Sequence, residues 1–225
     1  MKNEKKLHEA IGLLQSIENN SRVDDAIKLI ASFMIDNVKR NKGDLMCRDF
    51  VSTDKTRPVL HLIFHDSERK TAVATDAHAL FTNQSEFIKT DGCGLRDIYG
   101  NEMKDAGVFP CWFKVIPTET QPTTIDADLE ETYKKALSEA KLYGRQSNKT
   151  KIFILVNGKQ WMTARHVGFM LRAGLDGWLV PKNSSNPMCS PLLKNWDGKQ
   201  LLLMPTHIDA TAIETKIRFK YVEKK

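Results

Sequence analysis

Apolar residues recur every three or four positions in several stretches of the chain, which is the period of an amphipathic helix. This spacing predicts helices over residues 3–19 and 22–40, and another over residues 126–143 in the second half. A shorter helix is expected over residues 163–173, because Gly174 follows its last apolar position and glycine commonly ends a helix.

Strand patterns fill most of the remaining chain. Short apolar runs rich in β-branched residues, bounded by polar turns, are typical of strands. The strands predicted in this way cover residues 45–52, 57–64, 71–81, 152–156, 178–181, 190–196, 201–208 and part of 212–225. The polar turn at residues 65–70 suggests an antiparallel pair, Asp197-Gly198 is a hairpin signal, and the alternating tail predicts an edge strand.

A proline-bracketed segment lies near the middle of the chain. Residues 90–107 have a loop-like composition with room for one short helix at 95–104, and Pro110 and Pro117 bracket the apolar segment that follows. Prolines in these places suit an edge strand or an extended linker, because proline donates no hydrogen bond. We therefore place a domain boundary here, with domains at 1–117 and 118–225. Both halves mix helices with antiparallel strands, so the predicted fold class is α+β.

Composition narrows the class of protein. The 225 residues are 41% hydrophobic and 28% charged, as in globular proteins. The longest apolar runs are far shorter than the roughly 20 residues that cross a bilayer, and the start of the chain has no signal-peptide pattern. Four cysteines form no CxxC pair, so we expect no metal cofactor. We also expect the protein to lie in the reducing cytoplasm.

The net charge of +6 is distributed unevenly. Residues 1–117 hold as many acidic as basic residues, so the whole excess lies in residues 118–225. An excess of this size is compatible with sequence-independent contact to a polyanion such as DNA. A solvated helix surface is the alternative interpretation of the lysines in residues 126–143.

One cluster of residues suggests catalysis. His61, His65, Asp76 and His78 lie close in sequence and offer a metal site or an acid–base pair, the basis of a metal-dependent hydrolase. The commoner interpretation is a turn in which Asp76 or Thr75 caps the backbone. Phosphate-binding glycine loops, nucleophile motifs and metal-binding motifs such as HExxH are missing from the sequence.

Several segments, in their order along the chain, resemble the bacterial DNA sliding clamp, the beta subunit of the replicative polymerase. Residues 57–81, RPVLHLIFHDSERKTAVATDAHALF, resemble that family's middle domain, with its Arg-Pro-Val-Leu strand and Thr-Asp-Gly-His-Arg-Leu turn. Residues 107–117, GVFPCWFKVIP, are similar to its Phe-Pro-Asp-Tyr-x-x-Val-Ile-Pro segment. Residues 157–171 and 201–208, NGKQWMTARHVGFML and LLLMPTHI, resemble the last domain's helix entry and terminal strand.

The resemblance covers residues 45–208 and implies a DNA-clamp-like, non-enzymatic protein of two α+β domains, each an antiparallel sheet with helices on one face. The family holds short peptides of polymerases and other clamp-binding proteins in a hydrophobic groove. By motif, the implied groove residues are Thr75, Leu80, Pro110, Lys114, Val115, Leu202, Met204 and Pro205. Ala79, Lys114 and Thr206-His207 depart from the family's more basic pattern.

The resemblance also implies non-specific contact with double-stranded DNA through helices that line a ring. The implied contact residues are Lys134, Lys135, Lys141, Arg165 and Arg172. Three two-domain subunits placed head to tail would supply the six domains of a ring, so a homo-oligomer is one expectation. A non-ring adaptor or decoy for clamp partners is the alternative.

Overall fold

A computed structural model describes residues 44–88, 94–142, 150–206 and 219–223. The predicted helices at 3–19 and 22–40 lie outside these residues. Within the described residues, no helix is both long enough and apolar enough to cross a membrane.

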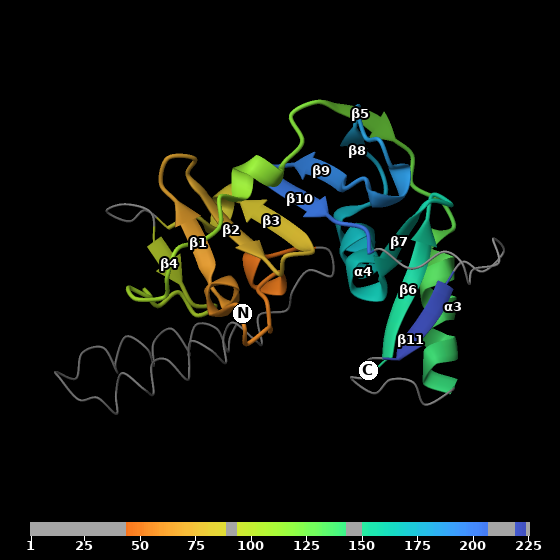
Figure 1. Cartoon of the computed structure of the whole chain (residues 1–225), viewed down its shortest axis with the longest axis horizontal. Coiled ribbons are helices and arrows are strands. Elements are labelled where there is room, and N and C mark those ends of the chain that lie inside the picture. The colour runs from red at the N-terminus through yellow and green to blue at the C-terminus, as the bar shows by residue number, and fades with distance from the viewer. Residues whose placement is uncertain (1–43, 89–93, 143–149, 207–218, 224–225) are drawn as a thin grey trace, which may run out of the picture.

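An antiparallel eight-stranded sheet runs through the molecule in the order β4-β1-β2-β3-β10-β9-β8-β5 (Figure 1). Its strands are β1 (Ile63–Asp66), β2 (Thr71–Thr75), β3 (Ala79–Asn83), β4 (Gly94–Arg96), β5 (Thr120–Thr123), β8 (Trp178–Pro181), β9 (Leu192–Trp196) and β10 (Lys199–Leu203). Strands β3 and β10 join the two halves of the chain, with Leu80 opposite Leu202. The sheet thus crosses the predicted boundary at residue 117, and the division into two domains stays a prediction.

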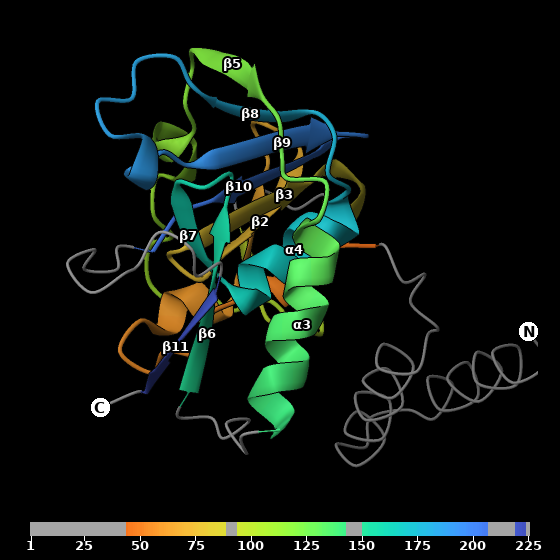
Figure 2. The same cartoon turned by 90° about the vertical axis from the view of Figure 1, so that its right-hand side faces the viewer.

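A second, three-stranded sheet has the order β11-β6-β7 and carries two helices (Figure 2). Its strands are β6 (Thr150–Val156), β7 (Gln160–Thr163) and β11 (Phe219–Glu223), and the helices are α3 (Leu129–Leu142) and α4 (Ala164–Ala173). The Thr163 hydroxyl caps α4 by accepting a hydrogen bond from the His166 N–H. Gly174 ends the helix with a φ of 85°, a value that favours glycine.

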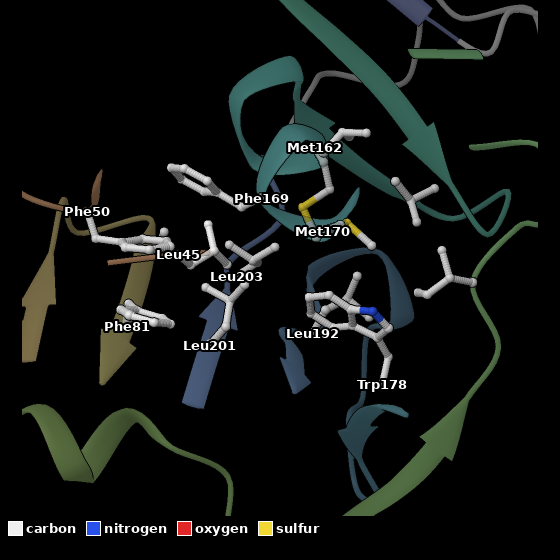
Figure 3. Packing of buried hydrophobic residues seen from close by; sticks show 14 of the residues in the cluster. Leu45, Phe50, Phe81, Met162, Phe169, Met170, Trp178, Leu192, Leu201 and Leu203 are labelled. Atoms are coloured by element: carbon white, nitrogen blue, oxygen red, sulfur yellow. The ribbon is translucent and has the colours of Figure 1, made fainter. Parts of the chain in front are cut away.

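The eight-stranded sheet has two differently covered faces because successive side chains of a strand point to opposite sides. One face, here called the closed face, carries residues such as Phe81, Leu201 and Leu203. The stretch Leu45–Phe50 and helix α4 cover it. Phe50 stacks on Phe81 with ring centroids 4.6 Å apart. Figure 3 shows these residues of the two halves of the chain packed in one core.

The opposite face, here called the open face, has a smaller apolar cluster. Val73, Leu80, Leu193 and Leu202 project from four adjacent strands. Two short 3-10 turns contribute to its cover, η2 (Pro58–His61) and η4 (Trp112–Val115). Short turns cover less of a sheet than a ten-residue helix does, so part of this face stays accessible.

Most of the predicted elements are confirmed. The helices at 126–143 and 163–173 correspond to α3 and α4, and the β1–β2 pair is antiparallel. The hairpin at Asp197-Gly198 joins β9 to β10, with both residues at positive φ. The tail contributes β11 at the edge of the smaller sheet. The α+β fold class with antiparallel sheets is therefore correct.

Several local predictions are wrong, among them the single strand at 71–81, which a turn divides into β2 and β3. Residues 45–52 form the 3-10 turn η1 (Cys47–Asp49) rather than a strand, and the predicted strand 57–64 begins as η2, because Pro58 starts a helical turn readily. Of the two alternatives for residues 108–117, an edge strand or an extended linker, the edge strand is wrong: the segment contains η4 and no strand. Residues 95–104 are no helix: β4 pairs with β1, and Arg96 bridges to Glu102.

Candidate functional site

An apolar groove of about 720 Å³ opens on the open face of the sheet. One wall is formed by residues 56–60, which include most of η2, and the other by the stretch 106–115. Leu80 and Leu202 form the floor, and both side chains are at least 95% buried, with exposed fractions of 5% and 2%. This cavity is called the groove below.

The structure brings most of the predicted groove residues together. Six of the eight line this cavity although they come from three distant segments: Thr75, Leu80, Pro110, Val115, Leu202 and Met204. Lys114 and Pro205 are not among the lining residues. Lys114 is exposed on η4, where neighbouring side chains of a tight helical turn point in different directions.

Sequence reasoning missed other lining residues. Pro58, Val59 and Leu60 belong to the RPVL segment, and Trp112 belongs to the segment 107–117, so both motifs already contained them. Their contribution depends on the 3-10 turns, which the strand-like pattern of the sequence did not reveal.

The turn between β2 and β3, residues 75–79, forms one end of the groove and is called the groove turn. Ala77 has a φ of 73°, in the left-handed region that costs a residue with a Cβ roughly 1 kcal/mol. Side chains hold this backbone: the Thr75 hydroxyl accepts from the Ala77 N–H at 3.1 Å. Asp76 Oδ1 accepts from the His78 and Ala79 N–H groups at 3.0 and 2.7 Å. The capping alternative for Asp76 and Thr75 is thereby confirmed.

The wall at 106–115 is anchored by a buried carboxylate. The Trp112 indole N–H donates to Asp66 Oδ2 at 3.0 Å, and the Arg69 guanidinium lies 4.0 Å from the Phe113 ring centroid. Burial raises the pKa of Asp66, but hydrogen bonds from Arg69 and Trp112 outweigh it, so the pKa is lowered from its ordinary value. The wall is therefore fixed to the β1–β2 hairpin at ordinary pH.

The rim of the groove is apolar and accessible. Val108 is 91% exposed, Val115 is 57% exposed and Met204 is 38% exposed. Exposed apolar side chains around a concave apolar floor are typical of a binding surface. Burying one Val, Leu or Phe side chain of a ligand contributes about 1.5–3 kcal/mol before ordering costs. The groove can thus hold apolar side chains.

The residues predicted to contact DNA lie on two helices, and several are engaged within the protein. Arg165 forms an ion pair with Asp76 at 3.1 Å, and Arg172 forms one with Asp49 at 3.0 Å. Lys134 pairs with Glu130 one turn earlier, Lys135 is exposed, and Lys141 lies in the last turn of α3. Both arginines therefore tie α4 to the first half of the chain, and DNA contact by these five residues stays a prediction.

The structure does not bring together the four residues of the alternative metal site, His61, His65, Asp76 and His78. His65 is buried and its Nδ1 accepts from the Ile88 N–H, His61 Nε2 lies 2.7 Å from the Asp54 carbonyl, and Asp76 caps the groove turn. Across 44–88, 94–142, 150–206 and 219–223, no group of three His, Cys, Asp or Glu residues is placed to hold a metal ion.

Comparisons with known proteins gave matches among solved structures. The sequence matches no protein-family model and no curated protein. Among solved structures, this chain is similar to the DNA polymerase III subunit beta of Borrelia burgdorferi, with 12% identity, a TM-score of 0.46, and coverage of 79% of this chain and 69% of that one. The C. crescentus beta sliding clamp gives 17% identity and a TM-score of 0.46 over 72% of this chain and 61% of that one.

A third similar structure is the Helicobacter pylori beta clamp bound to a DNA ligase peptide, with 14% identity and a TM-score of 0.43. The match covers 72% of this chain and 61% of that clamp, so this chain spans less than two thirds of its length.

Proposed function

We propose that this protein is a sliding-clamp-like factor of DNA replication or repair that binds short apolar peptide motifs of its partner proteins in the groove. The partners are a DNA polymerase or other clamp-binding proteins. The groove acts as a docking surface for side chains and carries out no reaction.

The observation that carries the proposal is the convergence of distant residues. Six residues implied by three separate motifs all line one groove: Thr75, Leu80, Pro110, Val115, Leu202 and Met204.

The shape and chemistry of the groove also favour a peptide. A cavity of about 720 Å³ lies in the range of ligand sites, roughly 300–1,000 Å³, and accommodates a few large side chains. Two of its lining residues, Met204 and Trp112, are common in protein-binding surfaces, where methionine adapts to different partners. The exposed apolar side chains of the rim offer further contacts to a bound peptide.

A binding titration tests the proposal. The probe is the fluorescein-labelled DNA ligase peptide of the kind bound by the H. pylori clamp, followed by fluorescence anisotropy. We expect saturable binding to the wild type and at least about tenfold weaker binding to Leu80→Ala/Met204→Ala, because two apolar contacts are lost. Met204→Ala alone avoids any loss of folding caused by the buried Leu80.

Met188→Ala is the matched control for the titration. Met188 is 44% exposed, similar to the 38% of Met204, but lies outside the groove on η5 (Pro187–Cys189). Its substitution should leave peptide affinity unchanged. Equal affinities of wild type and the double variant would refute the groove assignment.

Ring formation is a separate part of the proposal. The same groove would serve an oligomeric ring and a non-ring adaptor or decoy. Light scattering at several concentrations, together with retention on circular DNA, distinguishes these two forms.

A further inference from the structure

The groove turn is stabilised by its own side chains and also by a residue from the second half of the chain. Asp76 uses Oδ1 to cap the backbone of the turn, while its other oxygen, Oδ2, receives Arg165 Nη1 at 3.1 Å. The Asp76 side chain is only 11% exposed, so an unpaired carboxylate would be costly in this place. Arg165 supplies its opposite charge.

Arg165 reaches the turn from the second half of the chain. It lies in the first turn of α4, and its Nη2 also donates to the Asp49 carbonyl at 2.7 Å. Its guanidinium carbon is 5.4 Å from the Phe169 ring centroid on the same helix. These contacts orient the guanidinium of Arg165 toward Asp76. The position of α4 therefore determines where the charge that pairs with Asp76 lies.

We infer that Arg165 is a positioning residue of the groove, acting through Asp76 on the backbone of residues 75–79. Arg165 is not among the residues that line the groove, and it contacts the turn through Asp76, which is not a lining residue either. Its relevance to peptide binding rests on the function proposed above. Its effect on the turn does not.

The physical step is the release of a strained backbone. Without Arg165, Asp76 turns toward water, and Oδ1 leaves the His78 and Ala79 N–H groups. Ala77 is then free to relax from its left-handed conformation, because one of the interactions that stabilise this conformation is lost. Leu80 follows directly and its place in the groove floor shifts.

Hydrogen exchange of the His78 and Ala79 amides, measured by NMR, tests the inference without any peptide. Arg165→Gln should accelerate both exchange rates about threefold or more, the effect of losing one partly exposed ion pair. Arg165→Lys keeps the charge and should restore rates close to those of the wild type. The Phe81 amide in β3 reports whether the whole protein has been destabilised.

Arg172→Gln is the matched control. Arg172 lies on the same helix and forms a similar ion pair, but with Asp49 rather than with the groove turn. It should leave the His78 and Ala79 rates unchanged. Unchanged rates in Arg165→Gln, or equal acceleration in both glutamine variants, would overturn the inference.

Peptide titration of the same variants separates the inference from the proposed function. If the wild type binds the DNA ligase peptide, Arg165→Gln should weaken it about threefold or more, and Arg172→Gln should not. Full affinity of Arg165→Gln would overturn a role of Arg165 in binding. A wild type that binds no peptide contradicts the proposed function, while the exchange rates still decide whether Arg165 positions the turn.

Discussion

The two faces of the eight-stranded sheet are built from the same strands but differ in their cover. Leu201 and Leu202 are neighbours on β10, and both are almost fully buried, yet Leu201 packs in the core under α4 while Leu202 lies at the floor of the groove. On the closed face a whole helix fills the space over the sheet. On the open face 3-10 turns leave it partly free. The difference shows that the groove arises from incomplete cover of an ordinary sheet.

The largest expected effect contrasts these two leucines. Leu201→Ala should lower the free energy of unfolding by about 4 kcal/mol, because it leaves a cavity in a closed core. Leu202→Ala should cost only about 2 kcal/mol, because the lost volume joins an open groove. Urea unfolding of the two variants measures both values. Equal losses would mean that the two faces are equally closed.

Lowering the pH should reduce the free energy of unfolding, because His65 is buried on the closed face. This histidine shares a face of β1 with Ile63 of the closed-face core, and burial lowers its pKa from 6.5 to about 4. Between these values the unfolded chain binds a proton that the folded protein excludes, so stability falls as the pH drops from 6.5 toward 4. The expected loss is about 2 kcal/mol.

The variant His65→Asn isolates this effect. Its side-chain oxygen can still accept from the Ile88 N–H, which His65 Nδ1 does at 3.1 Å. Urea unfolding of wild type and variant is compared at pH 7 and pH 4.5. The difference between the two proteins removes the contributions that other titrating groups make to the pH dependence, such as Glu86, whose pKa is raised by burial. If the free energy of unfolding falls by the same amount in both proteins between pH 7 and pH 4.5, His65 is not the source of the acid sensitivity.

The smallest expected effect lies in the groove turn. Ala77→Gly should raise the free energy of unfolding by about 0.5 kcal/mol, because glycine tolerates the φ of 73° but loses more freedom on folding. Thermal unfolding of the variant measures this gain. A loss of stability would indicate that the Ala77 methyl group makes packing contacts worth more than the relieved strain.

The sequence predicted the second half of the fold better than the first. Helix α4 has a regular apolar period, a Thr163 cap and a final Gly174, all of which are local signals. By contrast, residues 45–52 alternate like a strand but form η1, because distant side chains satisfy its polar groups: Glu86 accepts from the Cys47 N–H, and Arg172 pairs with Asp49. No local pattern contains such contacts.

The site was predictable in its outline but not in its details. The resemblance to sliding clamps implied Leu80, Leu202 and Met204 as groove residues, and all three line the groove. The same motifs also selected Lys114, which η4 leaves outside the lining. DNA contact by Arg165, implied by the resemblance, stays a prediction, while its ion pair with Asp76 could not be predicted, because Asp76 lies 89 residues earlier in the chain.

Methyl NMR during titration with the DNA ligase peptide tests the central claim most directly, because it reports both faces of the sheet in one experiment. We expect shifts for the methyl groups of Leu80, Val115, Leu202 and Met204 in the groove, and none for those of Leu201 and Leu203 on the closed face. Saturating peptide that leaves the groove methyl groups unchanged, or that shifts the two faces equally, would contradict the account.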